Sequence, residues 1–316
     1  MAESPGAAAR SPAPPRYGLV LGGGGARGAA AIGILQVLQE HGIRPAAVAG
    51  TSMGALIGAF LAAGWSPGEI ADLAVGTRWT EVFDLAGTGG LMKGERFQHW
   101  LARHLPGTFA ELPVPLVCTA TDIDTGELLY LREGDLPSAL RATCAFPGAF
   151  VPVERDGRHL VDGGLKSTVP VAVIREYPVD VVIACDFQPP LDRPVVGGRQ
   201  EKSLAWKRFW ETLTFQRRNL AADILLKAVD ILQTEVCRRQ LEDHPPDLLI
   251  KPPMPEVNIE DFRLLPRIIE EGAAAARAAL ADRPDLLPGA GGSPAAPAGT
   301  PAGRDPAGAD DRPAAS

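Results

Sequence analysis

A serine set between glycines is the strongest chemical feature of this sequence. Residues 50–54 read Gly-Thr-Ser-Met-Gly, the pattern GxSxG, and stand between a short apolar stretch and the apolar segment ALIGAFLAAG. Glycines two residues either side of a serine let the chain turn tightly from a strand into a helix, which exposes the hydroxyl at the helix N-terminus. The helix dipole favours developing negative charge there. The pattern predicts a nucleophile at Ser52, and a plain helix cap is the alternative.

A serine hydroxyl needs a neighbouring base to take its proton. The five histidines of the chain have no flanking motif that marks one of them for this task. Asp162 ends an apolar stretch and is followed by two glycines. A partly desolvated carboxylate beside a hydroxyl can accept its proton directly, whereas an Asp-Gly turn without chemistry is the alternative. Because both motifs occur together, we predict that Asp162 is the base of Ser52.

A second glycine-rich motif spans residues 22–28, with the sequence GGGGARG. It lies between a strand-like and a helix-like stretch, so its backbone N–H groups can converge on an anion. The spacing also fits the dinucleotide fingerprint, but the next strand ends in Gly50-Thr51-Ser52 and lacks the acidic residue that would bind a ribose hydroxyl. Taken alone, the motif fits a nucleotide site, an oxyanion hole or a tight turn.

The elements that must position these motifs alternate between strands and helices. This order predicts a three-layer α/β/α fold with a mostly parallel central sheet. Strands are expected at residues 17–21, 46–49, 116–121, 128–131, 159–161, 179–185 and 247–250. Helices are expected from about 31 to 41, after Ser52, over 96–105 and over 259–281. A capping box at residues 66–69 predicts the start of a further helix.

One folded domain is expected over residues 16–283, which is long enough for a well-developed core. Residues 1–15 and 284–316 consist mainly of Ala, Pro, Gly, Ser and Asp. Segments of this composition bury too little apolar surface to offset the entropy that they lose on ordering. We therefore predict a disordered tail at each end of the domain.

The composition argues against two classes of protein. The formal net charge of −7 gives no overall basic field, so nucleic acid is not expected as a partner. No apolar stretch resembles a signal peptide, and no run approaches the roughly 18 consecutive apolar residues of a membrane span. A soluble, cytoplasmic protein is expected.

The four cysteines lack CxxC spacing, which favours buried free thiols over a disulfide or a metal cluster.

Residues 203–218 fit least well into a sheet-packing pattern. Trp206, Phe209, Trp210 and Leu213 fall on one helical face, with basic residues nearby. An amphipathic helix of this kind can lie in a lipid interface or form a lid over an acyl site, whereas core packing or a dimer contact is the alternative. Within a helical segment expected over 203–245, we predict a lid or a peripheral contact at the inner face of the membrane. The oligomeric state stays open.

In their order along the chain, the motifs resemble the patatin-like phospholipase family, in particular its compact bacterial members. The resemblance rests on GGGGARG at 22–28, GTSMG at 50–54, RATCAFPGAFVPV at 141–153 and DGG at 162–164. It covers residues 16–283, and the ordered combination is far more specific than any single motif. The resemblance implies a patatin-like fold, related to the acyltransferase and lysophospholipase architecture, and a Ser-Asp dyad without histidine.

The resemblance also assigns roles to matching positions. It implies that Ser52 is the nucleophile, that Asp162 is its base, and that the reaction needs no cofactor or metal ion. Arg27 matches the basic position of the glycine loop, where it either anchors the loop or touches the oxyanion. The N–H groups expected to form the oxyanion hole belong to Gly23, Gly24 and Gly25. The motif residues expected to support the site are Gly28, Gly50, Met53, Gly54, Gly163 and Gly164.

Two departures from the family pattern flank the motifs. Thr143 stands where a serine is common, and Ser167-Thr168 stand where two asparagines are common. These positions bear on fine positioning and substrate choice rather than on the chemistry. The predicted function is a serine esterase or lipid acyl hydrolase, of phospholipase A or lysophospholipase type, that forms an acyl-enzyme. An acyltransferase that uses the same serine, and a non-catalytic nucleotide- or lipid-binding protein, are the alternatives.

Overall fold

A computed structural model describes residues 14–83, 91–189, 191, 220–254, 256–259 and 261–289. Eight strands of this part form one sheet in the order β5-β6-β3-β2-β1-β7-β8, with β4 paired to β3. The strands are β1 (Tyr17–Leu21), β2 (Pro45–Gly50), β3 (Leu116–Asp122), β4 (Leu128–Leu131), β5 (Val153–Arg155), β6 (Arg158–Asp162), β7 (Val181–Cys185) and β8 (Leu248–Ile250). Strands β1, β2, β3, β7 and β8 run parallel, whereas β4 and β6 are antiparallel to β3 and β5 is antiparallel to β6.

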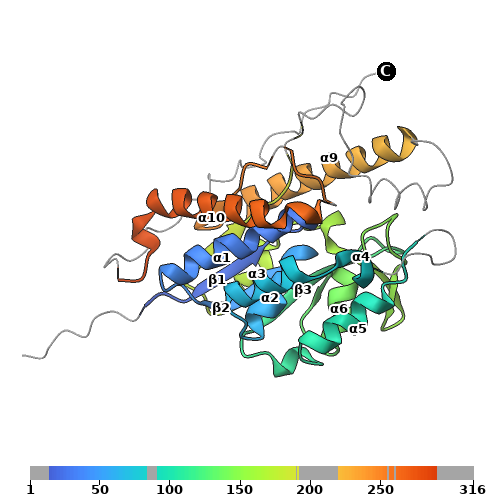
Figure 1. Cartoon of the computed structure of the whole chain (residues 1–316), viewed down its shortest axis with the longest axis horizontal. Helices are drawn as coiled ribbons and strands as arrows, with labels where there is room; N and C mark the ends of the chain where they lie inside the picture. The colour runs from blue at the N-terminus through green and yellow to red at the C-terminus, as the bar shows by residue number, and fades with distance from the viewer. Residues whose placement is uncertain are drawn as a thin grey trace, which may run out of the picture.

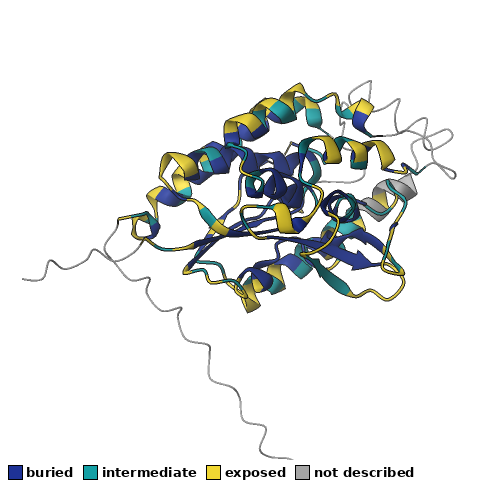
Figure 2. Ribbon diagram, turned by 90° about the horizontal axis from the view of Figure 1, so that it is seen from below, coloured by how far each residue is buried: buried dark blue, intermediate teal, exposed yellow. Residues whose placement is uncertain are grey.

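Helices cover both faces of the sheet and make three layers (Figure 1). The α-helices are α1 (Ala30–Glu40), α2 (Met53–Ala62), α3 (Pro67–Gly76), α4 (Trp79–Val82), α5 (Glu95–His104), α6 (Leu136–Thr143), α7 (Val171–Ile174), α9 (Leu220–Asp243) and α10 (Leu265–Ala281). Short 3-10 turns are η1 (Gly25–Ala29), η3 (Phe109–Glu111), η4 (Gly163–Leu165), η5 (Phe262–Leu264) and η6 (Pro284–Leu286). Figure 2 shows buried strands between helices whose outer sides are exposed.

The alternation of side chains along each strand feeds two separate cores. Leu19 and Leu21 of β1 belong to the core under α1, α2 and α10, whereas Val20 belongs to the core under α7 and α9. Successive side chains of a strand point to opposite faces, so a strand covered on both sides is apolar throughout. This is why the parallel strands appear in the sequence as continuous apolar runs. The predicted fold class is confirmed.

Some element boundaries differ from the sequence prediction. The long C-terminal helix, expected from residue 259, begins at Leu265, after the turn η5. Pro266 explains the late start, because proline lacks an N–H group and is tolerated only in the first turn of a helix. Strand β5 was not predicted. It has three residues, of which only Val153 is buried, so it is too short to show a period.

The packed part of the chain extends past Arg283, where the sequence prediction ended it. The turn η6 follows directly, and the side chain of Leu286 is 2 % exposed. The Tyr17 hydroxyl donates a hydrogen bond to the Leu286 carbonyl oxygen at 2.7 Å. The buried side chain of Leu286 and this hydrogen bond hold the turn η6 against β1. The sequence prediction had assigned these residues to the C-terminal tail because of their composition. Buried packing therefore reaches Leu286, a few residues past the predicted end at 283.

The segment predicted as a lid or membrane contact is described only from residue 220 onward. Residues 203–218, with both tryptophans, lie outside the described residues, so that contact stays a prediction. In the described part, Gln233 and Cys237 of α9 are buried, and Cys237 packs against the second face of the sheet. This half of the segment therefore covers the sheet. Among the described residues, no helix is long and apolar enough to cross a bilayer.

Helices α1 and α10 approach so closely that backbone meets backbone. A Cβ atom added to Gly33 of α1 would lie 1.8 Å from the carbonyl oxygen of Ile269, and one added to Gly272 of α10 would lie 2.0 Å from that of Ala30. Contacts this short have no room for a methyl group. The two glycines therefore set the distance between these helices, and thus the position of the glycine loop that leads into α1.

We predict that Gly272→Ala destabilises the protein, although alanine is the better helix former. The clash with the Ala30 carbonyl should cost about 1–3 kcal/mol, in the range of overpacked cores. Gly76→Ala is the matched control, because an added Cβ at this helical position meets no atom within 4 Å. Thermal unfolding should show a lower Tm for the first variant and no loss for the second. Equal Tm values would contradict the close packing.

Candidate active site

Ser52 and Asp162 lie at the same level on one side of strand β3, because β2 and β6 pair with the same side and β4 pairs with the other. In the parallel pair of β2 and β3, Gly50 is opposite Cys118. In the antiparallel pair of β3 and β6, Ala120 is opposite Asp162. Ser52 follows Gly50 by two residues, and Ala120 follows Cys118 by two, so the register carries Ser52 to the level of Asp162. The sheet thus brings together the two predicted residues that are far apart in sequence.

The GxSxG motif forms a sharp turn from β2 into α2. Ser52 is the N-cap of α2 and has φ 53° and ψ −126°, a conformation that is strained for a residue with a side chain. The flanking glycines make the turn possible. A Cβ atom at Gly54 would lie 2.2 Å from the carbonyl oxygen of Leu21, and one at Gly50 would lie 2.6 Å from the amide nitrogen of Ala55. This is the geometry that a nucleophile elbow requires.

The carboxyl group of Asp162 is buried and hydrogen-bonded within the site. The side chain bonds to the Ser52 hydroxyl, and its Oδ1 atom accepts the Gly164 N–H at 2.7 Å. Burial raises the pKa of Asp162 to about 6, and the hydrogen bonds from Ser52 and Gly164 hold it from rising further. A carboxylate with this pKa is ionised at neutral pH and is a stronger base than an exposed one.

A hydrogen-bonded network ties the serine turn to the loop after Asp162. The Thr51 hydroxyl donates to the Ser167 carbonyl oxygen at 2.9 Å and lies 2.7 Å from the Thr119 hydroxyl. Because the one proton of Thr51 goes to Ser167, Thr119 must be the donor to Thr51. Gly163 makes room for this network, since a Cβ atom there would lie 2.1 Å from Thr119 Oγ1. All three threonine and serine positions are buried.

Two neighbours of Ser52 come from the end of α6, and the sequence motifs gave them no such role. The buried Thr143 hydroxyl accepts a hydrogen bond from the Ser52 backbone N–H at 2.9 Å. The Cys144 thiol hydrogen-bonds to the Ser52 side chain, and burial together with the charge of Asp162 raises the pKa of this thiol well above its usual value. The sequence marked Thr143 only as a departure from a family pattern. The spacing of residues along the sequence cannot reveal a hydrogen bond between an amide and a hydroxyl that lie on separate elements.

The glycine loop lies directly against Ser52. A Cβ atom added to Gly23 would lie 3.5 Å from the Cβ atom of Ser52. The Gly23 N–H, however, donates to the Thr168 carbonyl oxygen at 3.0 Å, so it is engaged in holding the loop. Among the described residues, the N–H groups of Gly24, Gly25 and Met53 have no hydrogen-bond acceptor. They are the donors in this region that remain for an oxyanion.

Arg27 anchors the glycine loop from within the protein. Its side chain is buried, with Nε donating to the Phe187 carbonyl oxygen at 3.1 Å and one terminal nitrogen donating to the Val257 carbonyl oxygen at 3.4 Å. Of the two roles considered for this arginine, these contacts favour loop anchoring. Gly28 allows the same loop to meet the elbow, because a Cβ atom there would lie 2.8 Å from the Met53 side chain.

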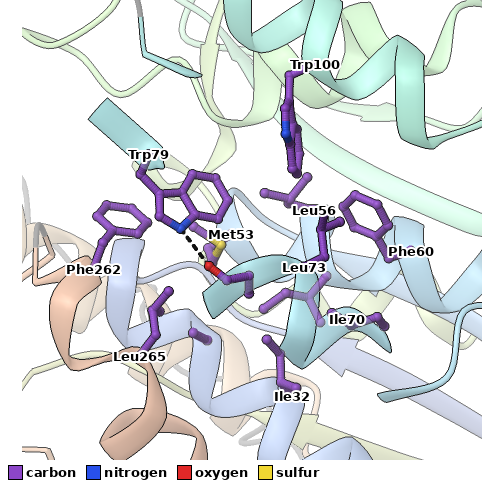
Figure 3. Close-up of a pocket in the computed structure, with 13 residues that line it drawn as sticks. Ile32, Met53, Leu56, Phe60, Ile70, Leu73, Trp79, Trp100, Phe262 and Leu265 are labelled. Carbon is purple, nitrogen blue, oxygen red and sulfur yellow. Dashed lines mark hydrogen bonds between the residues drawn. The ribbon is translucent and has the colours of Figure 1, made fainter. Parts of the chain in front are cut away.

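An apolar cavity begins beside the serine turn. Its wall includes Met53, the residue after Ser52, and continues past Leu56 to Trp79, Trp100 and Phe262 (Figure 3). Every residue that lines it is apolar, and the lining comes from helices α1 to α5, η1, η5 and α10. Its volume of about 20 Å³ holds little more than one water-sized sphere in this conformation. A longer guest would require the flexible Met53 and the two tryptophans to move.

The described residues offer no other constellation for the same chemistry. The histidine side chains with hydrogen bonds contact carbonyl oxygens on α5 (His99 and His104) or the Asp124 carboxylate (His159), and none of these bonds involves Ser52 or Asp162. In the part of the chain that the structure covers, no group of three or more His, Cys, Asp or Glu could hold a metal ion. All four cysteines are free; Cys118, Cys185 and Cys237 are buried as the sequence predicted, whereas Cys144 is half-buried.

A solved structure shares this fold. The protein VipD from Legionella pneumophila superposes with a TM-score of 0.55 over 85 % of this chain and 67 % of its own, at 16 % sequence identity. This likeness concerns the fold alone.

Sequence comparisons identify relatives and a family. An uncharacterized NTE family protein of Mycobacterium tuberculosis is 37 % identical over 181 residues, which are 55 % of this chain and 50 % of the relative. A second such protein of that organism is 30 % identical over 300 residues, 89 % of this chain and 49 % of the relative. Patatin-like phospholipase domain-containing protein 7 of Rattus norvegicus is 31 % identical over 279 residues, 80 % of this chain and 20 % of the relative. The chain spans about half the length of the two mycobacterial relatives.

The model of the family described as patatin-like phospholipase matches residues 19–174, which contain the glycine loop, the serine turn and Asp162. Through these residues, the chain belongs to the patatin-like phospholipase family.

Proposed function

We propose that this protein hydrolyses acyl esters of lipids through a dyad of Ser52 and Asp162. One observation carries the proposal: the hydroxyl of a strained strand-to-helix turn is hydrogen-bonded to a buried carboxyl group whose pKa is about 6. Strain holds the hydroxyl outward, and the carboxylate is ionised at neutral pH and able to take its proton. The match to a phospholipase family supports a lipid as the source of the ester.

The proposed reaction has two halves. Asp162 takes the proton of Ser52 as the serine oxygen attacks the ester carbonyl, and the proton then passes to the departing alcohol. The acyl group stays on Ser52 until a water molecule, deprotonated by Asp162, attacks it and restores the serine. The negative oxygen formed in each half would be bound by the N–H groups of Gly24, Gly25 and Met53, helped by the N-terminal end of α2.

The apolar cavity offers a place for the acyl chain. It starts at Met53, one residue from the nucleophile, and has no polar lining residue that would oppose hydrocarbon. The acyltransferase alternative shares the first half of the reaction and differs only in the acceptor of the acyl group. The nucleotide-binding alternative has less support, because the N–H groups of Gly22, Gly23 and Ala26 are engaged with protein carbonyl oxygens.

The proposed base predicts how hydrolysis depends on pH. We expect kcat/KM to rise tenfold per pH unit below about pH 6 and to level off above it, because only the ionised Asp162 accepts a proton. Ser52→Ala and Asp162→Asn should each abolish product formation from a panel of phosphatidylcholine, lysophosphatidylcholine and triacylglycerol, with products identified by mass spectrometry. A flat profile down to pH 5 in folded protein, or an active Asp162→Asn variant, would contradict the role of Asp162.

The Asp162→Asn variant also separates loss of activity from loss of folding. Its activity should fall, whereas its stability at high pH should rise. A carboxyl group whose pKa is raised by folding adds stability below its unfolded pKa, and this stability is lost as the pH rises through the folded value of about 6. At pH 8, Asp162→Asn should therefore be more stable than the wild type by up to roughly 3 kcal/mol. At pH 4 the two proteins should unfold alike.

Thr143 is a positioning residue in this proposal, since it holds the backbone of Ser52 and not the substrate. Thr143→Val keeps the shape but leaves the Ser52 N–H without its acceptor, a loss on the order of 1–3 kcal/mol. We expect kcat to fall about tenfold or more with KM for a soluble ester unchanged, and Thr143→Ser to restore it. Thr121→Val is the matched control, because the buried Thr121 hydroxyl has no partner in the described part of the chain. Equal kcat in both valine variants would refute this role.

The cavity predicts acyl-chain preference. Leu73→Ala should widen it and raise the ratio of long-chain to short-chain ester hydrolysis, because Leu73 lines the wall. Leu61→Ala is the control, since Leu61 packs against the same core without lining the cavity. The ratio is measured with palmitoyl and butyryl esters of one alcohol. If both variants shift the ratio equally, the cavity does not hold the acyl chain.

A further inference from the structure

A second hollow lies on the surface where the end of α3, the helix α4 and the outer side of α5 meet. Its volume is about 580 Å³, and it is open to solvent. Unlike the apolar cavity, it is lined largely by charged and polar side chains. We call this site the basic hollow; its ionisable lining residues are Arg78, Glu81, Arg96, His99 and Arg103.

The basic hollow carries an excess of positive charge. Arg96, His99 and Arg103 follow one another at intervals of three and four residues, so they share one exposed face of α5. Glu81 is the one acidic lining residue, and it pairs with Arg78 at 3.0 Å. Within the described ranges, neither Arg96 nor Arg103 forms a salt bridge to a carboxylate. This concentration of arginine contrasts with the net charge of −7 of the whole chain.

The basic hollow and the apolar cavity share a wall. Trp100 of α5 lines both, and Trp79, which lines the cavity, is the residue after Arg78. In Figure 3, Trp100 and Trp79 lie on the cavity side opposite Ile32. Arginine side chains beside an apolar wall that contains tryptophan suit the surface of a bilayer, because phosphate groups lie there and tryptophan rings favour the boundary between head groups and hydrocarbon.

We propose that the basic hollow binds the phosphate groups of anionic lipids at a bilayer surface and so holds the Trp100 wall of the apolar cavity against the membrane. The guanidinium group of arginine binds phosphate through two parallel hydrogen bonds, and each basic residue near an anionic surface adds to the attraction. Glu81 is neutralised by Arg78, which leaves Arg96 and Arg103 to meet the lipid. Other anionic molecules would also suit these arginines; we name a lipid because the proposed function is hydrolysis of lipid esters. The proposal makes no use of residues 203–218.

The test is binding to large vesicles, measured by co-sedimentation at low salt, with vesicles of phosphatidylcholine alone or mixed with phosphatidylglycerol. The full chain is used with Ser52→Ala as background, so that lipid is not consumed and binding is independent of hydrolysis. Arg96→Gln combined with Arg103→Gln is compared with Arg44→Glu, an exposed arginine outside the hollow. Both changes lower the net charge by two. Thermal unfolding verifies that each variant is folded.

We expect binding only to the vesicles that contain phosphatidylglycerol, with a loss in 0.5 M salt because the charges are screened. The double glutamine variant should bind on the order of tenfold more weakly, and Arg44→Glu should bind as the parent does. The proposal is overturned if no anionic vesicle binds, if the double variant binds like the parent, or if both variants weaken equally. If the wild-type protein binds the vesicles but does not hydrolyse their esters, the result counts against the Ser52–Asp162 dyad and not against the basic hollow.

Discussion

The central constraint of this structure is the register of strand β3 against β2 and β6. Its parallel pairing with β2 and its antiparallel pairing with β6 place Ser52 and Asp162 at one level on the same side of β3, while β4 pairs with the other side. A shift of one residue in either pairing would turn a side chain to the other face of the sheet. The network of Thr51, Thr119 and Ser167 joins the two loops at this level and opposes such a shift.

The site combines two features that cost stability. Ser52 has a positive φ, and Asp162 keeps a carboxyl group away from water, which raises its pKa. The surrounding structure offsets these costs through hydrogen bonds to the same residues, from Gly164 N–H to the carboxylate and from Ser52 N–H to Thr143. Glycines at the close approaches remove clashes that would force the turn open. Strain and burial are also what would make the hydroxyl accessible and its base effective.

Much of the fold was predictable because it depends on local periodicity. The strands 17–21 and 128–131 have the predicted bounds, and the capping box at Ser66 is present. The sequence did not predict β5, the late start of α10 or the packing of Leu286, since these depend on a proline position or on contacts between distant segments. For the site, the motifs marked the residues that the structure brings together. The engagement of the Gly23 N–H and the contact of Thr143 with Ser52 depend on tertiary packing alone, and the catalytic roles stay predictions.

The most direct test of the dyad is the reaction of the protein with a fluorophosphonate, which labels a serine only when a base activates it. Intact-mass and peptide mass spectrometry should show one phosphonyl group on Ser52 at pH 8. This label should be absent from Ser52→Ala, and the labelling should be strongly slowed in Asp162→Asn. Labelling at another residue, or equal labelling rates in the wild type and Asp162→Asn, would contradict it.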